Sequence, residues 1–315
     1  MPRRSRRRAR VQARRRSCSP GPRPRRRRAA PRGPGALAAP WRGTRRACRA
    51  PGQRSSCSRD SRLGFTATEA GPPGFLPSDP AAAKALLASR GIRLVGGFVT
   101  GVLHVSVRRA AALAELARQA RWLAVAGADV LVLAAASQGQ GYDTRDRLDD
   151  AAWSALLDGI ARVREIATRQ GLAVALHPHF GTVIERAAEV ERLLASSDVD
   201  LCLDTGHLTL GGCDPASLVA EVPARIRHVH LKDVRADIAA AVAAGTVPYG
   251  EGVRRGLYVP LGEGSARIAG VLKALTRAEY AGWYVFEQDV MLTRPPHGPP
   301  SWIRASLDFV KASDA

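Results

Sequence analysis

Five of the seven histidines in this 315-residue chain follow three consecutive apolar segments that predict β-strands. The five are His177, His179, His207, His228 and His230. An imidazole titrates near neutral pH and also binds divalent metals, so such a cluster suits acid–base catalysis, metal binding or both. His177 and His179 flank a proline and could instead be structural loop histidines.

Carboxylates accompany these histidines. Asp204 ends the second apolar segment, Glu185 and Asp233 lie shortly beyond the first and the third, and Glu287 ends a later segment. An isolated ionised carboxylate at a buried strand end is strongly disfavoured. Imidazoles and carboxylates together are typical ligands of a divalent cation, which is the simplest explanation of the mixture.

Each motif also has a purely structural interpretation. The run Asp204-Thr205-Gly206-His207 places an imidazole one turn after a carboxylate, but a tight turn with a hydrogen-bonded histidine gives the same pattern. His228 and His230 project to one side of a strand. We expect only His230 to lie near the mouth of the site and His228 to be a core histidine. Lys232 and Asp233 are either a solvated salt-bridge pair or part of the site.

The elements that position these residues alternate along the body of the chain. Short apolar segments and longer helical patterns follow one another, which predicts β/α units and a parallel sheet. Strands are expected near 65–69, 92–98, 129–134, 172–177, 199–204, 226–231 and 283–287. Helices are expected near 79–90, 107–126, 148–170, 185–196, 214–221, 265–276 and 301–313. Seven units favour a TIM (β/α)8-type barrel, in which the carboxyl ends of the strands share one face.

The first 62 residues differ sharply from the rest. They contain 22 Arg and one Asp, and their only large apolar side chains are Val11, Leu37 and Trp41. No packed core can form from this composition. We therefore expect a disordered tail over 1–62, for which out-of-frame translation is one explanation, and a catalytic barrel over 63–315. The first strand of the barrel is then missing or replaced, and deleting the tail should leave stability unchanged or improved.

The formal net charge of +20 arises entirely in this tail, because residues 63–315 carry a net charge of −1. The Arg runs of the tail have no interleaved aromatic platform on which bases could stack, so nucleic acid is not the expected partner. A nucleic-acid-binding arm and a transit peptide are the alternatives. Neither a secretory apolar segment nor a membrane span of about 18 apolar residues occurs. A cytoplasmic location, no membrane, no disulfide framework and a small-molecule substrate are expected, with a homo-oligomer as an option.

Seven motifs between Leu63 and Phe309, in the same order, resemble the sugar isomerase/epimerase barrels related to xylose isomerase. Among these, the chain is similar to the myo-inosose-2 dehydratases. The motifs are GFLP (74–77), GGFV (96–99), LHPHFGT (176–182), LCLDTGHL (201–208), RHVHLKDVR (227–235), VPLGEG (259–264) and WYVFEQD (283–289).

The resemblance implies a divalent metal, often Mn²⁺ or Co²⁺, held by Glu, Asp, His and Glu from successive strand ends. Asp204, His230 and Glu287 match the last three positions. At the first position either His177 substitutes for the glutamate or Glu185 swings in from the following loop, and we favour Glu185.

The resemblance further implies a hydro-lyase that removes water from 2-keto-myo-inositol, a polyhydroxylated ketone of inositol breakdown. It places His207 and His179 against the substrate, and we expect them to be the base and the acid, since a protonated imidazole can donate to a leaving hydroxyl. His177 and Lys232 are further catalytic candidates, and Glu69 and Asp233 are expected to bind substrate hydroxyls.

Two other functions fit the same sequence. A ketose isomerase or epimerase would use the same metal and the same first proton removal. A nucleic-acid-associated protein would act through its Arg-rich arm, with the barrel as a relic.

Overall fold

The computed structural model describes residues 45–46, 64–290 and 301–313. Contacts divide the chain into two units, Met1–Ala39 and Pro40–Ala315. All described residues lie in the second unit, so the description below concerns that unit alone.

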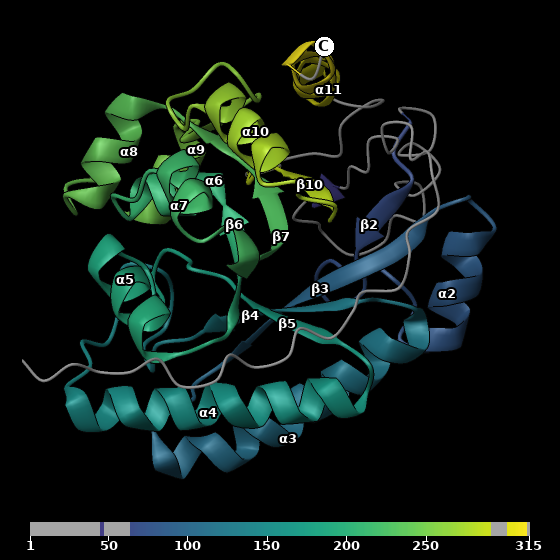
Figure 1. Cartoon of the computed structure of the whole chain (residues 1–315), viewed down its shortest axis with the longest axis vertical. Helices are drawn as coiled ribbons and strands as arrows, with labels where there is room; N and C mark the ends of the chain where they lie inside the picture. Colours follow the sequence, from purple (N-terminus) through teal and green to yellow (C-terminus); the bar gives the residue numbers. More distant parts are fainter. Residues whose placement is uncertain (1–44, 47–63, 291–300, 314–315) are drawn as a thin grey trace, which may run out of the picture. The chain divides into compact units, whose positions relative to one another are not determined.

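Eight parallel strands form the central sheet in the order β1-β10-β7-β6-β5-β4-β3-β2 (Figure 1). Their bounds are β1 Arg45–Arg46, β2 Ala67–Glu69, β3 Arg93–Gly101, β4 Val130–Ala135, β5 Ala173–Leu176, β6 Asp200–Asp204, β7 Ile226–Leu231 and β10 Tyr284–Glu287. A separate antiparallel pair joins β8 (Asp233–Val234) to β9 (Tyr258–Val259). The sheet is that of the expected (β/α) barrel.

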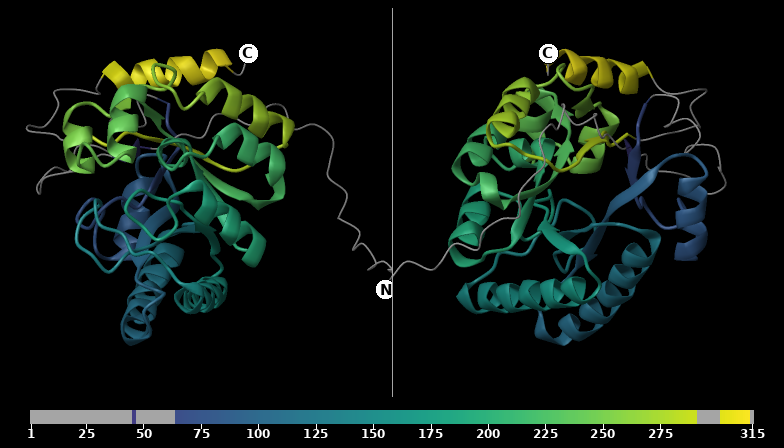
Figure 2. Two further views of the ribbon diagram at one scale, coloured as in Figure 1. Left: turned by 90° about the vertical axis from the view of Figure 1, so that its left-hand side faces the viewer. Right: turned by 45° about the vertical axis from the view of Figure 1, so that its right-hand side comes forward.

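Helices cover the outer side of the sheet. Their bounds are α2 Pro80–Ala88, α3 Ser106–Ala126, α4 Asp150–Arg169, α5 Ala187–Ser196, α6 Thr205–Leu210, α7 Pro215–Glu221, η2 Pro223–Arg225, α8 Ala236–Ala243, α9 Tyr249–Arg254, α10 Ile268–Arg277 and α11 Ser301–Ser313. Figure 1 shows α3 and α4 running alongside each other, and Figure 2 shows α11 next to α10. No helix in the described part of the chain is long and apolar enough to cross a membrane.

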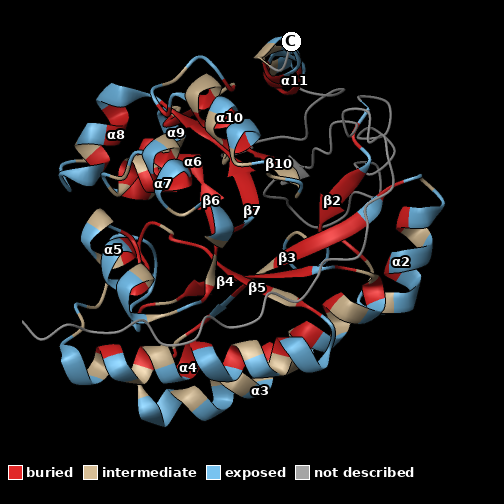
Figure 3. Cartoon of the chain, viewed as in Figure 1, coloured by how far each residue is buried: buried red, intermediate tan, exposed pale blue. Residues whose placement is uncertain are grey.

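Helix starts follow from local chemistry. The carboxylate of Asp79 accepts a hydrogen bond from Ala82 N, and Pro80 occupies the first turn, where a missing N–H does no harm. Asp149 caps α4 in the same way. Helices that flank the sheet show one buried and one exposed face in Figure 3, whereas α8 and α9 pack in a separate apolar cluster with Tyr258.

Strand side chains alternate between the helix-covered outside and the barrel interior. Leu131 of β4 belongs to the main core shared with the helices, whereas its neighbour Val132 belongs to a small inner cluster that includes Cys202. Asp204 lies two residues beyond Cys202 in β6, so it projects to the same inner side. The site residues therefore reach the mouth of the barrel because of strand periodicity.

The first strand of the sheet comes from the Arg-rich segment. Arg45 and Arg46 pair in parallel with Phe286 and Glu287 of β10. A two-residue strand of the Arg-rich segment thus lies where the first strand was expected to be missing or replaced, and the domain boundary at residue 63 stays a prediction. The rest of the tail prediction falls on 1–44 and 47–62, outside the described residues.

Candidate active site

Four side chains meet at the carboxyl ends of neighbouring strands. Asp204 and Glu287 are the last residues of β6 and β10, His230 is the penultimate residue of β7, and His177 follows β5. All four are buried, and one ligand atom from each lies within 4.8 Å of those of the others. Atoms bound to a cation at about 2.0–2.3 Å are separated by roughly 3–4.5 Å, so the cluster is close to the required size.

Hydrogen bonds aim the ligand atoms at a common point. His177 donates through Nδ1 to the Pro178 carbonyl (2.8 Å), which turns Nε2 toward Asp204 Oδ2 at 3.4 Å. Asp204 Oδ1 accepts from His207 N (2.8 Å). His230 Nδ1 lies 3.7 Å from Asp204 Oδ2 and 2.8 Å from Glu287 Oε2.

Two of these atoms are left without a hydrogen bond within the described part of the chain. Asp204 Oδ2 and His230 Nδ1 are both buried and have no hydrogen-bond partner there. Each such buried group costs about 1–3 kcal/mol. A cation at their centre would satisfy both, so the two nitrogen and two oxygen donors fit a divalent metal, with imidazole and carboxylate matching Mn²⁺, Co²⁺ or Zn²⁺.

Lys232 lies against this cluster and is only 1% exposed. Its Nζ is 3.2 Å from His207 Nε2, 3.5 Å from Asp204 Oδ2 and 3.5 Å from Glu287 Oε1. Burial opposes the charge, but Asp204, Asp289 and Glu287 outweigh it and raise the pKa of Lys232 well above its usual range. Burial also opposes the charge of Asp204, whose pKa is nevertheless lowered by Lys232 and His207. Lys232 is therefore an ammonium group at neutral pH.

The glycine in the Asp204-Thr205-Gly206-His207 run makes room for this lysine. A Cβ at Gly206 would lie 2.8 Å from Lys232 Cγ. Thr205 Oγ1 donates to the Lys232 carbonyl (2.7 Å) and accepts from Lys232 N (2.8 Å). The run is thus more than a capped turn, because it also holds Lys232 in place.

His179 and His207 form a pair of rings with centroids 3.8 Å apart. Burial, followed by His177 and Lys232, lowers the pKa of His179 to about 3. Burial, His179 and Lys232 lower the pKa of His207 well below its usual value. Both rings are neutral at pH 7, so they can accept a proton, and the expectation that a protonated imidazole supplies the acid does not fit this environment.

Three side chains near the cluster were not anticipated. Tyr249 Oη donates to Asp289 Oδ2 (3.1 Å), and Asp289 Oδ2 is 3.3 Å from Lys232 Nζ. The Tyr142 ring, half exposed, stacks at 5.7 Å from His179. Asp289 ends the WYVFEQD motif and could have been found there. The tyrosines lie outside every motif, so no sequence signal distinguished them.

Three predicted site residues have other roles. Glu185 Oε2 accepts from Gly181 N (2.7 Å), and its Oε1 lies 3.7 Å from Arg145 and 3.5 Å from Arg186. These contacts tie the loop after β5 together, and the ligand cluster contains His177 instead of Glu185. The preference for Glu185 as the first ligand is therefore not supported.

Asp233 is also a structural anchor rather than a substrate ligand. Its two oxygens accept from four backbone N–H groups, those of Val234, Gly262, Gly264 and Ala266. Both Asp233 and Lys232 are only 1% exposed, so the alternative of a solvated salt-bridge pair is wrong.

Glu69 lies beneath the cluster instead of facing a substrate. Its Oε1 is 2.9 Å from Nε2 of both His228 and His230. His228 is fully buried in the barrel interior, which agrees with its interpretation as a core histidine.

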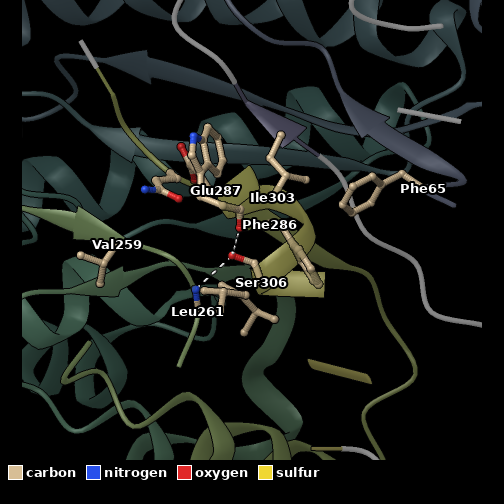
Figure 4. A pocket seen from close by; sticks show the side chains of 10 residues that line it. Phe65, Val259, Leu261, Phe286, Glu287, Ile303 and Ser306 are labelled. Atoms are coloured by element: carbon tan, nitrogen blue, oxygen red, sulfur yellow. Dashed lines mark hydrogen bonds between the residues drawn. The ribbon is translucent and has the colours of Figure 1, made fainter. Parts of the chain in front are cut away.

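A small cavity is lined in part by Glu287. Figure 4 shows its lining, where Leu261 N donates to the Ser306 hydroxyl at 3.0 Å. Its volume of about 10 Å³ has room for no more than one water molecule. This cavity is therefore no substrate site.

Comparison with known proteins places the chain in a family. The family model of the xylose isomerase-like TIM barrel matches residues 60–313. An inosose dehydratase from Geobacillus kaustophilus is 31% identical over 251 residues, covering 76% of this chain and 81% of that protein. An inosose dehydratase from Erwinia tasmaniensis is 33% identical over 237 residues, covering 72% and 78%.

Solved structures agree on the fold. A 3-keto-D-glucoside 4-epimerase from E. coli superposes with a TM-score of 0.65 at 18% identity, covering 85% of this chain and 98% of the other. A D-psicose 3-epimerase from Clostridium cellulolyticum gives 0.62 at 18% identity, covering 82% and 92%. At this identity the likeness concerns the fold alone. From the family match and the relatives above 30% identity, the chain belongs to the inosose dehydratases within the xylose isomerase-like TIM barrels.

Proposed function

We propose that the protein is a metal-dependent hydro-lyase that converts 2-keto-myo-inositol into a trihydroxycyclohexane dione and water. The observation that carries this proposal is the convergence of His177, Asp204, His230 and Glu287 on one point beside Lys232 and His207. The inosose dehydratase relatives support the choice of substrate.

The four converging side chains would hold the metal, and Mn²⁺ and Co²⁺ are the proposed ions. When bound, the metal supplies a Lewis acid that polarises the substrate ketone and makes the neighbouring C–H acidic. The protein's own groups then have to move two protons.

His207 is the proposed base, and the His179 ring lies directly beside it. A neutral imidazole takes the proton from the carbon next to the ketone. The Lys232 ammonium donates a proton to the hydroxyl on the next carbon, whose C–O bond breaks so that water leaves. The remaining enol tautomerises to the dione. Because His207 Nε2 lies 3.2 Å from Lys232 Nζ, the proton gained by His207 can return to Lys232 and reset both groups.

The ring arrangement favours dehydration over epimerisation. An epimerase must remove a proton from one face of the substrate and return it to the other, which requires two groups on opposite faces. The His179 and His207 ring centroids lie 3.8 Å apart, and Lys232 Nζ is 3.2 Å from His207 Nε2, so the proton-transfer groups form one cluster. This supports a base and an acid acting on neighbouring positions.

The test is direct. The purified full-length protein is treated with EDTA, reloaded with Mn²⁺ or Co²⁺ and mixed with 2-keto-myo-inositol while the ultraviolet absorbance of the dione is followed. We expect dione formation only with metal. A folded, metal-loaded protein that forms no dione but epimerises a ketose would transfer the proposal to the epimerases. A cytoplasmic location and a homo-oligomeric assembly complete the proposal, and light scattering tests the assembly.

A further inference from the structure

Glu69 is a predicted substrate residue whose carboxylate is buried inside the barrel. It ends β2, its exposure is 1%, and its Oε1 lies 2.9 Å from Nε2 of His230, a residue 161 positions away in the sequence. A distance of 2.9 Å is that of a charge-assisted hydrogen bond between an imidazole N–H and a carboxylate.

Glu69, His228 and His230 could by their spacing hold a cation themselves. That arrangement would use Nε2 of His230, whereas the cluster at the mouth uses Nδ1 of the same ring. The mouth cluster supplies four ligand groups and contains the buried Asp204 Oδ2 and His230 Nδ1, which have no hydrogen bond in the described part of the chain. The inner group has three members already joined by 2.9 Å hydrogen bonds. The metal therefore belongs at the mouth and Glu69 acts as a hydrogen-bond acceptor.

We infer that Glu69 is a positioning residue, which fixes the tautomer and the ring orientation of His230 so that its Nδ1 lone pair faces the metal. A His230 ring that donates through Nε2 to Glu69 must present Nδ1 as its ligand atom. The negative carboxylate also makes the ring a stronger electron donor, as outer-sphere carboxylates do for metal-bound histidines. This inference rests on the metal site of the proposed function but not on its substrate.

The surroundings keep the Glu69 carboxylate in this position. His228 Nε2 bonds to the same oxygen at 2.9 Å. Gly96 of β3 lies next to the carboxylate, and a Cβ there would meet Glu69 Oε1 at 3.5 Å, an ordinary van der Waals contact.

The first experiment measures metal affinity. Mn²⁺ is titrated by calorimetry into EDTA-treated full-length protein, either wild type or Glu69→Gln, which keeps the shape of the side chain but removes its charge. We expect Mn²⁺ to bind Glu69→Gln about 10–100-fold more weakly. The matched control is Asp146→Asn, because Asp146 Oδ2 also bonds to a histidine, His104 Nε2 at 2.8 Å, far from the metal ligands in the sequence.

The control separates a general loss of stability from a specific effect. Asp146→Asn should bind Mn²⁺ within about twofold of wild type, and the thermal melts of all metal-free proteins are recorded in parallel. Wild-type affinity in Glu69→Gln, or an equal loss in both variants, would overturn the inference. If wild-type protein binds no Mn²⁺ at all, the proposed function fails instead.

The second experiment needs no variant and so remains decisive if Glu69→Gln does not fold. Wild-type protein with ¹⁵N-labelled histidine is loaded with diamagnetic Zn²⁺ and its imidazole nitrogens are observed by NMR. We expect His230 to show a protonated Nε2 and a metal-bound Nδ1. A protonated Nδ1, or metal bound through Nε2, would refute the role assigned to Glu69.

Discussion

Lys232 Nζ lies within 3.5 Å of three carboxylates and of His207 although the residue is only 1% exposed. A buried lysine ordinarily loses its charge, because desolvation disfavours the ammonium form. Here the carboxylates restore the charge, while burial first, and then a neighbouring histidine and Lys232, lower the pKa of both His179 and His207. The environment thus makes Lys232 the acid and a neutral histidine the base. A histidine in water, which titrates near neutral pH, could serve as either.

Replacing Lys232 should separate the two proton transfers. In Lys232→Met we expect dehydration to slow by about 10²–10⁴-fold, the usual contribution of a general acid. Exchange of the proton next to the ketone with D₂O, followed by NMR, should continue because His207 remains. Lys273→Met, at an exposed lysine of α10, is the control and should behave as wild type. Loss of exchange together with dehydration would argue against Lys232 as the acid.

The identity of the first ligand can be tested at two positions on the same loop. His177→Gln removes a member of the cluster, so Mn²⁺ affinity measured by calorimetry should fall by more than the roughly 10–100-fold expected for an outer-sphere change. Glu185→Gln should keep Mn²⁺ affinity within about threefold, because its carboxylate bonds to Gly181 N and faces two arginines. The reverse order of effects would restore Glu185 as the ligand.

At the scale of elements, the strands and helices before residue 221 were predictable to within a few residues, except for β1 and α6, which no expected element covers. Ile226–Leu231 begins and ends where expected, and α4 runs over Asp150–Arg169 instead of 148–170. The segment from Asp233 to Val259 was not predictable, since β8, β9, α8 and α9 are short and their pairing is tertiary. The contacts of Glu185, Asp233 and Glu69 could not be predicted from the sequence for the same reason. A sequence places a carboxylate at a strand end, but its hydrogen-bond partners come from distant elements.

Asp233 illustrates this at β8. It connects the β8–β9 pair to the loop before α10 through four backbone N–H groups. A Cβ at Gly264 would lie 2.3 Å from Asp233 Oδ1, so the loop closes tightly around the carboxylate. The loop thereby covers the side of the barrel near Tyr258.

Removing this anchor should destabilise the fold. Asp233→Ala leaves four buried or partly buried N–H groups without an acceptor, so the free energy of unfolding in urea should fall by about 2–4 kcal/mol. Asp237→Ala, at an exposed carboxylate that pairs only with Arg235 on the surface, should change it by less than about 0.5 kcal/mol. Equal stability of the two variants would show that water replaces the Asp233 contacts at no cost.

At the scale of the whole molecule, two residues of the Arg-rich segment pair with the barrel sheet, because β1 lies beside β10. Its composition predicts no packed core, and composition cannot reveal that two arginines complete a sheet through backbone hydrogen bonds, which need no particular side chain. The pairing of Arg46 with Glu287 links β1 directly to a strand that carries a proposed metal ligand.

Two truncations distinguish this arrangement from a dispensable tail. Deleting residues 1–39 removes the separate first unit and should leave the melting temperature unchanged. Deleting 1–62 also removes β1 and exposes the edge of β10, so the backbone hydrogen bonds of that pairing, worth about 0.5–1.5 kcal/mol each, are lost. For a domain of this size each kcal/mol lowers the melting temperature by about 2–4 °C. We therefore expect the longer deletion to melt several degrees lower and to bind Mn²⁺ more weakly, because Glu287 is then held on an edge strand. Equal melting temperatures and equal Mn²⁺ affinities for both truncations would return the domain boundary to residue 63.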